Sequence, residues 1–296
     1  MRMASVGAGT LGQVMIAAVG LLGLAACSRG SDPVLVQLAS ARELVGSLRT
    51  GVAQSIQATD RAVLAETDEA SEAFARQARE LSGQVEGQRD RLAGVLQKLA
   101  FDEETRDLGA FTARWGELRK VGDETLKLAV ENTNLKARRL SFGPVAQAAD
   151  AFEAALEAAL VHPAGRGDSA SARLLASRAE LALRKAQLLQ GPHIAEADDA
   201  AMSKLEERMA ALEKQATDAL STLEPSLGPA STAAARAALQ RFSTQSKELI
   251  ALSRRNTNVL SLSLAMSRLP PLTSACDAAL DTLAQALDKR GFTGTR

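Results

Sequence analysis

The chain has 296 residues, of which 46% are hydrophobic and only 3% are aromatic, with one Trp and no Tyr. This apolar content excludes global disorder, and few aromatic residues beside abundant Ala and Leu favour helices over strands. The 35 basic and 35 acidic residues balance and form no concentrated basic block, which argues against a nucleic-acid partner. We therefore expect an all-α protein of one large or two ordinary domains.

Residues 1–26 have the pattern of a bacterial lipoprotein signal peptide. Arg2 precedes an apolar run over Val14–Ala26 that is too short to span a bilayer comfortably. The run ends in Leu24-Ala25-Ala26-Cys27, which resembles the lipobox of bacterial lipoproteins. In that family a peptidase cleaves before the Cys, whose thiol takes a diacylglycerol and whose new amine is acylated, so that several acyl chains anchor the protein. The alternative is an ordinary cleaved signal peptide followed by a chance Cys.

This resemblance implies an address in the bacterial cell envelope. We expect residues 27–33 to form a lipidated tether that holds the mature chain in the periplasm. In enterobacterial lipoproteins, Ser after the lipidated Cys, here Ser28, goes with sorting to the outer membrane, whereas Asp retains the protein at the inner membrane. The other cysteine is Cys276, so a lipidated Cys27 leaves no disulfide within the chain. Cys276 occupies an apolar helical position and is expected to be a small buried thiol, not a nucleophile.

Residues 34–161 are expected to form a first four-helix unit, because apolar residues recur there at steps of three and four. The predicted helices run from about Leu38 to Val63, from Asp68 to Leu99, from Asp102 to Leu128 and from Phe142 to Ala159. Thr67 or Asp68 is the expected N-cap of the second helix, and the Asn-Thr-Asn segment 132–134 should break the chain before the fourth. Phe142 is predicted in the core, and Pro144 should kink the fourth helix or mark its start.

Residues 162–168 form the expected linker, which is rich in Gly and Pro. A second four-helix unit follows over 169–289, with interruptions at Gly191-Pro192 and around Pro225 to Pro229. Residues 290–296 are expected to be a frayed tail. The predicted fold is therefore two tandem antiparallel four-helix bundles, each of which should unfold cooperatively by itself. A single extended coiled coil is the alternative, but the predicted breaks argue against it.

An internal repeat supports the two-unit organisation. The stretch Glu124–Leu156 recurs without a gap as Glu248–Leu280. Identical residues meet at Glu124/Glu248, Leu128/Leu252, Asn132/Asn256, Thr133/Thr257, Asn134/Asn258, Leu140/Leu264, Ala154/Ala278, Ala155/Ala279 and Leu156/Leu280. Matched apolar positions are Leu135/Val259, Phe142/Met266, Val145/Leu269 and Phe152/Cys276. A repeated Asn-Thr-Asn beside matched apolar residues is hard to obtain from composition alone, so we interpret the chain as a tandem duplication of one helical unit.

Each unit resembles the periplasmic four-helix-bundle sensor domain of methyl-accepting chemotaxis proteins and related receptors. The residues that carry this resemblance are Asn132-Thr133-Asn134, Phe142-Gly143-Pro144, Phe152, Leu156, Asn256-Thr257-Asn258, Pro270 and Leu280. The resemblance implies a bundle that binds a small solute or a binding protein and shifts a helix toward the membrane. The chain departs from that family because it has no transmembrane helices, linker module or cytoplasmic signalling coiled coil. We therefore expect signalling to need a protein partner.

Residues with catalytic or metal-binding chemistry are sparse. His193 precedes Glu196, Asp198 and Asp199, but an acidic first turn at a helix N-terminus explains this pattern better than a metal site does. His162 lies in the linker and is expected to be solvated. No nucleophile elbow, P-loop or zinc-protease motif occurs in the sequence. We predict no catalytic residues, no cofactor, no metal and no enzymatic activity.

Arginines flank both Asn-Thr-Asn breaks, at Arg138, Arg139, Arg254 and Arg255. Arginines near an interrupted helix can bind carboxylates in a bidentate way, although a solvated face is the plainer interpretation. Gln88 occupies a core-like position and is expected to fix helix register or to line a small cavity.

The sequence therefore predicts a non-enzymatic, membrane-anchored lipoprotein that binds a small solute as a sensor does, or docks to an envelope receptor. The alternative is a structural or assembly role in the envelope, with the bundles as spacers and adhesive surfaces. The expected partners are the membrane, through lipid on Cys27, and a protein or a small solute; the ligand-binding residues are not predicted. A pocket between helices would favour a solute, and an exposed apolar stripe would favour a protein.

Overall fold

The computed structural model describes residues 32–161 and 169–293, and within these ranges the chain forms helices and short connections but no strand. The all-α prediction is confirmed. The elements are α1 (Pro33–Val63), α2 (Asp68–Leu99), α3 (Asp102–Glu131), α4 (Thr133–Leu140), the π-helical turn η1 (Ser141–Val145), α5 (Ala146–Val161), α6 (Ser169–Leu188), α7 (Gln190–Ala195), α8 (Asp199–Leu227), α9 (Pro229–Arg255), α10 (Thr257–Ser267) and α11 (Leu269–Thr293). The predicted signal peptide, Cys27 and the linker 162–168 lie outside the described residues.

Local capping explains where the long helices of the first half begin. The Asp32 carboxylate accepts a hydrogen bond from the Val34 amide, and Pro33 occupies the first helical position of α1. Oγ1 of Thr67 accepts from the Ala70 amide at 3.1 Å, so Thr67 is the N-cap of α2. Helix α3 begins at residue 102, as predicted, with acidic residues through its first turn.

The predicted interruptions of the second half lie close to observed helix ends, because α6 ends at Leu188 and α8 ends at Leu227 before Gly228. Pro225 lies inside α8, which continues to Leu227. The helix expected to stop at Gly191-Pro192 ends at Leu188, and after the turn residue Leu189 the dipeptide lies within the short α7. The tail predicted from residue 290 is helical as far as Thr293. Near this end Arg42 of α1 donates a hydrogen bond to the Leu287 carbonyl, a long-range contact that periodicity along the chain does not reveal.

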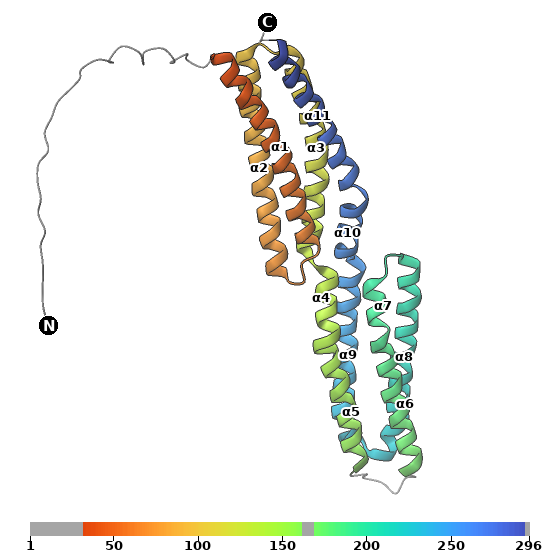
Figure 1. Cartoon of the computed structure of the whole chain (residues 1–296). Coiled ribbons are helices and arrows are strands. Elements are labelled where there is room, and N and C mark those ends of the chain that lie inside the picture. Colours follow the sequence, from red (N-terminus) through yellow and green to blue (C-terminus); the bar gives the residue numbers. More distant parts are fainter. Residues whose placement is uncertain (1–31, 162–168, 294–296) are drawn as a thin grey trace, which may run out of the picture.

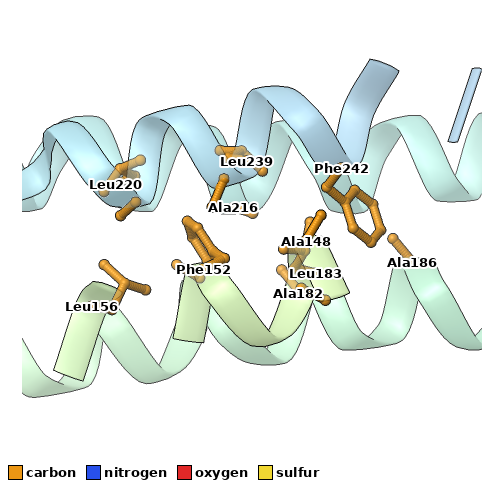
Figure 2. Packing of buried hydrophobic residues seen from close by; sticks show 14 of the residues in the cluster. Ala148, Phe152, Leu156, Ala182, Leu183, Ala186, Ala216, Leu220, Leu239 and Phe242 are labelled. Atoms are coloured by element: carbon orange, nitrogen blue, oxygen red, sulfur yellow. The ribbon is translucent and has the colours of Figure 1, made fainter. Parts of the chain in front are cut away.

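The helices form two bundles that lie end to end, as Figure 1 shows. In the first bundle α1, α2, α3 and α11 share one apolar core, in which Phe111 and Trp115 are the largest buried side chains. In the second bundle α4 and α5 share a core with α6, α8 and α9. Figure 2 shows Phe152 and Leu156 of α5 among apolar side chains that include Phe242 of α9. Each bundle thus buries the apolar faces of helices from both halves of the chain.

The two bundles exchange their last helices, which corrects the predicted division of the chain. The predicted units 34–161 and 169–289 each kept the fourth helix in their own bundle. Instead α5 packs against α9 and α6 of the later half, and α11 packs against α3 and α1 of the earlier half. Apolar spacing determines which face of a helix is buried, but it does not determine which of two similar cores receives that face.

The exchange begins at the two Asn-Thr-Asn breaks. Asn132 follows α3 with a φ of 49°, and Asn256 follows α9 with a φ of 52°, so one residue leaves the right-handed helical region and the next helix starts directly after it. Asn adopts this left-handed conformation more readily than most residues that carry a Cβ. Such a break does not reverse the chain, so α4 runs away from the first bundle and α10 runs away from the second (Figure 1).

The helix is interrupted around Pro144 as expected, but the position of Phe142 differs from the prediction. Pro144 lies inside η1, between α4 and α5. Phe142, predicted in the core, is 77% exposed, and its repeat counterpart Met266 is 72% exposed. A π-helical turn inserts extra backbone into the helix, so an apolar pattern continued through 141–145 places Phe142 on the wrong face. Phe152, beyond the turn, is buried as predicted.

Candidate binding groove

The two Asn-Thr-Asn segments, 132–134 and 256–258, contact each other where the bundles meet; we refer to them together as the clasp. The Thr133 amide donates to Oγ1 of Thr257 at 3.1 Å, and the Thr257 amide donates to Oγ1 of Thr133 at 3.2 Å. The amides of Asn134 and Asn258 donate to each other's Oδ1 at 3.1 Å. Residues 124 apart in the chain are therefore paired around a local two-fold axis.

The clasp supplies caps that α4 and α10 do not make for themselves. The first turn of a helix has amide groups without intrahelical partners. Asn132 and Asn256 precede these helices in the left-handed conformation, and neither makes a side-chain cap bond to its own helix. Side chains of the other repeat accept the free amide hydrogens instead. The sequence predicted the motif as a helix break but did not predict that its two copies bind each other. The recurrence of the motif is the one sequence signal for this pairing.

Helix α7 contacts one side of the clasp and breaks its symmetry. Nδ2 of Asn134 donates to the Ile194 carbonyl at 2.7 Å, and Nδ2 of Asn256 donates to the Glu196 carbonyl at 2.8 Å. Nδ2 of Asn132 is buried and has no hydrogen-bond partner among the described residues. The reason is that the connection between α1 and α2 is short and contains no helix equivalent to α7.

A groove of about 1090 Å³ lies beside the clasp and α7. Its lining comes from both bundles, namely the α1–α2 connection and α10 on one side, and α4, η1, α6 and α7 on the other. Asn134 and Asn258 of the clasp are part of this lining. A groove of this size can hold a drug-sized ligand, which typically occupies roughly 300–1,000 Å³.

Large apolar side chains are exposed in the groove. Phe142 of η1 and Leu188 of α6 line it, together with the half-buried Leu135 of α4. Phe142 is 77% and Leu188 is 75% exposed, although most Leu and Phe side chains of the described residues are buried or half-buried. Exposed apolar residues that gather in a concave site mark a surface that gains free energy when it is covered.

Most of the positive charge around the groove is neutralised. Nη1 of Arg139 lies 2.8 Å from the Asp68 carboxylate. Nη2 of Arg184 lies 2.6 Å from Oε2 of Glu153, and this hydrogen bond is the main reason that the pKa of Arg184 is above its ordinary value. Arg138 is exposed and has no ion pair or side-chain hydrogen bond among the described residues. Its guanidinium is therefore available to a ligand.

The other two arginines that flank the breaks are engaged within the chain. Nε of Arg254 lies 2.6 Å from Oε1 of Glu206, and Nη2 of Arg255 lies 2.6 Å from Oε2 of Glu131. The Arg254 hydrogen bond is the main reason that the pKa of Glu206 is below its ordinary value. Neither arginine lines the groove. Among four arginines that look alike in the sequence, the structure leaves Arg138 uncommitted.

His193 is buried, and its partners differ from the carboxylates that follow it in the sequence. Its Nδ1 lies 2.9 Å from Oγ of Ser253 on α9, and its Nε2 lies 2.8 Å from Oε1 of Glu206 on α8. The Ser253 hydroxyl is fully buried and lies within hydrogen-bond distance of the His193 carbonyl as well. This network joins α7 to α8 and α9, and its hydroxyl does not face the groove. Over the described residues, no group of three potential metal ligands occurs.

Cys276 is a buried free thiol, as predicted. Burial raises its pKa to about 12, so the thiol stays protonated near neutral pH. Cys27, the predicted lipidation site, lies outside the described residues, and its modification remains a prediction. None of the helices described combines the length and the apolar character needed to cross a membrane.

Comparison with known proteins gives no relative from which to transfer a function. Neither a protein-family model, nor a curated protein, nor a solved structure matches the chain. The groove is therefore interpreted from its own residues. It combines exposed apolar side chains, one uncommitted guanidinium and walls that belong to both bundles.

Proposed function

We propose that this chain is a lipid-anchored protein of the bacterial envelope that binds a small solute in the groove between its bundles. The observation that carries the proposal is that the groove is lined from both bundles and by clasp residues Asn134 and Asn258. A solute there would contact the residues that hold the bundles together.

Occupancy of such a groove can act on the arrangement of the two bundles. A ligand shifts an equilibrium between arrangements only when it contacts one arrangement better than another. Walls on separate bundles provide such differential contacts, because any change at the clasp alters the distance between them. A sensor-like protein would report this change to an envelope partner through its exposed helix faces.

The predicted anchor would hold the groove away from the membrane. Helix α1 has 31 residues, and at ~1.5 Å per residue it is about 45 Å long. Its first residue lies six positions after Cys27, whereas Ala65 and Glu66, just beyond its end, line the groove. A lipid on Cys27 would thus place the outer end of the first bundle at the membrane and the groove about 45 Å from it.

A structural or assembly role is the alternative, and one observation favours it. Leu260, Leu262 and Met266 of α10 are 48%, 39% and 72% exposed. Apolar residues exposed on one helix suit contact with another protein. In this case the bundles would act as a spacer, and the groove would stay empty.

Thermal unfolding of the purified protein against amino acids, organic acids and aromatic solutes tests solute binding. A ligand that binds only the folded state stabilises it by about 2.7 kcal/mol at about one hundred times its dissociation constant. We expect at least one class to raise the melting temperature, and Phe142→Ala to reduce that shift. If no solute raises it, the proposal of solute binding is wrong and the protein-docking role takes its place.

The anchor is tested separately by Cys27→Ser. We expect this variant to leave the membrane fraction and appear in the soluble envelope fraction, because the thiol that would carry the lipid is gone. The matched change Cys276→Ser should leave fractionation unchanged. Membrane association that persists in the Cys27→Ser protein contradicts lipid anchoring.

A further inference from the structure

We infer that the solute is an organic monocarboxylate with a large apolar part. The inference rests on the proposed function, because it names the chemical class of ligand for the same groove. It follows from three properties of the lining, namely one available cation, one available anion and a set of exposed apolar side chains.

The available cation is Arg138 on α4. A guanidinium is planar and can bind both oxygens of a carboxylate through two parallel hydrogen bonds. The other arginines in the lining are already paired, Arg139 with Asp68 and Arg184 with Glu153 and Asp150. The groove therefore offers one positive position for an anionic group of a ligand.

The available anion is Glu66, in the connection between α1 and α2. It lines the groove, is exposed and has no ion pair among the described residues. Its charge repels a second negative group on a ligand in the same groove. The lining thus favours a ligand with one negative charge over dicarboxylates and phosphates.

The apolar part of the ligand is indicated by the positions of Leu135, Arg138 and Phe142. Leu135 and Arg138 lie three residues apart on α4 and so share one face of that helix, and Phe142 of η1 lines the same groove. Apolar surface therefore lies beside the guanidinium, and Leu188 adds to it from α6. A small acid such as acetate would leave this surface uncovered in a groove of about 1090 Å³.

Titration calorimetry on the whole chain carrying Cys27→Ser, which removes the predicted lipid, tests the inference. The ligands are hexanoate, octanoate and decanoate below their micelle concentrations, with octan-1-ol, octylamine and octanedioate as matched controls. We expect affinity to rise about two- to fourfold for each added methylene group, as burial of apolar surface requires. Octanoate should bind at least about tenfold more tightly than the alcohol, the amine or the dicarboxylate.

Matched variants assign the recognition to residues. Arg138→Gln should weaken octanoate binding by about 10- to 100-fold, the range for a lost charge-assisted hydrogen bond, and leave octan-1-ol unaffected. Arg208→Gln, at an exposed position of α8 outside the groove, should change neither. Glu66→Gln should strengthen octanedioate binding, so that the affinities for octanedioate and octanoate become more similar. Circular dichroism confirms that each variant is folded.

The outcomes separate this inference from the proposed function. Binding of octanoate that is insensitive to Arg138→Gln, or equal binding of acid and alcohol, overturns the inference of a carboxylate. Binding of a cation, sugar or phosphate that Phe142→Ala weakens would also overturn it, although solute binding in the groove would stand. If no solute of any class binds, the inference of a carboxylate ligand and the proposal of solute binding are both wrong.

Discussion

At the scale of single residues, the clasp depends on side chains that are short and polar. The hydroxyls of Thr133 and Thr257 lie 3.1 Å apart, and each also accepts the backbone amide of the other residue. Both residues are buried, so these amide groups have no access to water as a substitute partner. Longer side chains would not fit between the two helix starts at this distance, so short polar residues suit both copies of the repeat.

Thr133→Val should destabilise the protein by about 1–3 kcal/mol, because it leaves the buried Thr257 amide without its acceptor while nearly preserving volume. Chemical denaturation measures the change. Thr217→Val is the matched control, since its hydroxyl donates to a carbonyl of its own exposed helix turn. Equal effects of the two substitutions would show that the clasp bonds contribute no more than a surface hydroxyl.

The Glu206 carboxylate should make stability depend on acid pH. Hydrogen bonds from Arg254 and then His193 hold its pKa below the ordinary value of 4.5. A lowered pKa in the folded state contributes stability that is present above pH 4.5 and is lost as the pH falls through the folded-state pKa. The denaturation midpoint of the native protein should therefore exceed that of Glu206→Gln at pH 7, and the difference should shrink below about pH 4.5.

Asp218→Asn is the control for this pH dependence, because it removes one partner of an ion pair that is exposed on both sides. We expect it to change the midpoint little across the same pH range. A difference between the native protein and Glu206→Gln that is constant from pH 7 to pH 3 would mean that the carboxylate acts through packing and not through its charge.

At the scale of secondary-structure elements, α1 and α2 approach closely at Gly51. A Cβ built on Gly51 would lie 2.8 Å from Cγ2 of Val85 on α2 and 3.3 Å from Oε1 of Gln88. The Gln88 oxygen is buried without a hydrogen-bond partner among the described residues. The backbone of α1 at Gly51 therefore packs directly against side chains of α2, even though this leaves the Gln88 oxygen unpaired.

Gly51→Ala should lower stability relative to Gly46→Ala by about 1–3 kcal/mol, although both changes gain about 1 kcal/mol in helix propensity. The stiff side chain of Val85 has few rotamers through which to move away from a new methyl group. Gly46 has open space around its Cβ position on the same helix. If both variants have denaturation midpoints above that of the native protein, then α1 and α2 can move apart at Gly51 without a loss of stability, and the prediction is wrong.

At the scale of the whole molecule, the exchange of α5 and α11 makes the two halves depend on each other. The cores combine helices from residues before and after the linker, and the clasp joins them at the centre (Figure 1). This arrangement reverses the expectation that 34–161 and 169–289 fold separately. Neither half contains the fourth helix that fills its own bundle.

A fragment of residues 32–161 should form a homodimer instead of a folded monomer. In such a dimer α5 of one copy would occupy the place that α11 has in the native chain, since Leu156 corresponds to Leu280 and Phe152 to Cys276 in the repeat. Light scattering after size-exclusion chromatography measures the mass. Addition of 169–293 should convert the homodimer to a one-to-one complex, whereas a compact monomer with cooperative unfolding would contradict the required exchange.

From the sequence alone, the all-α class, the helix starts at Asp68 and Asp102 and the breaks at Asn132 and Asn256 could be predicted, because apolar spacing and capping depend on neighbours along the chain. Lipidation of Cys27 remains a prediction from the same source. Only the tertiary structure decided that the breaks pair, that the last helices exchange and that Arg138 has no ion-pair partner among the residues described. These outcomes depend on which of several similar partners each segment meets in space, and local preference does not encode that choice.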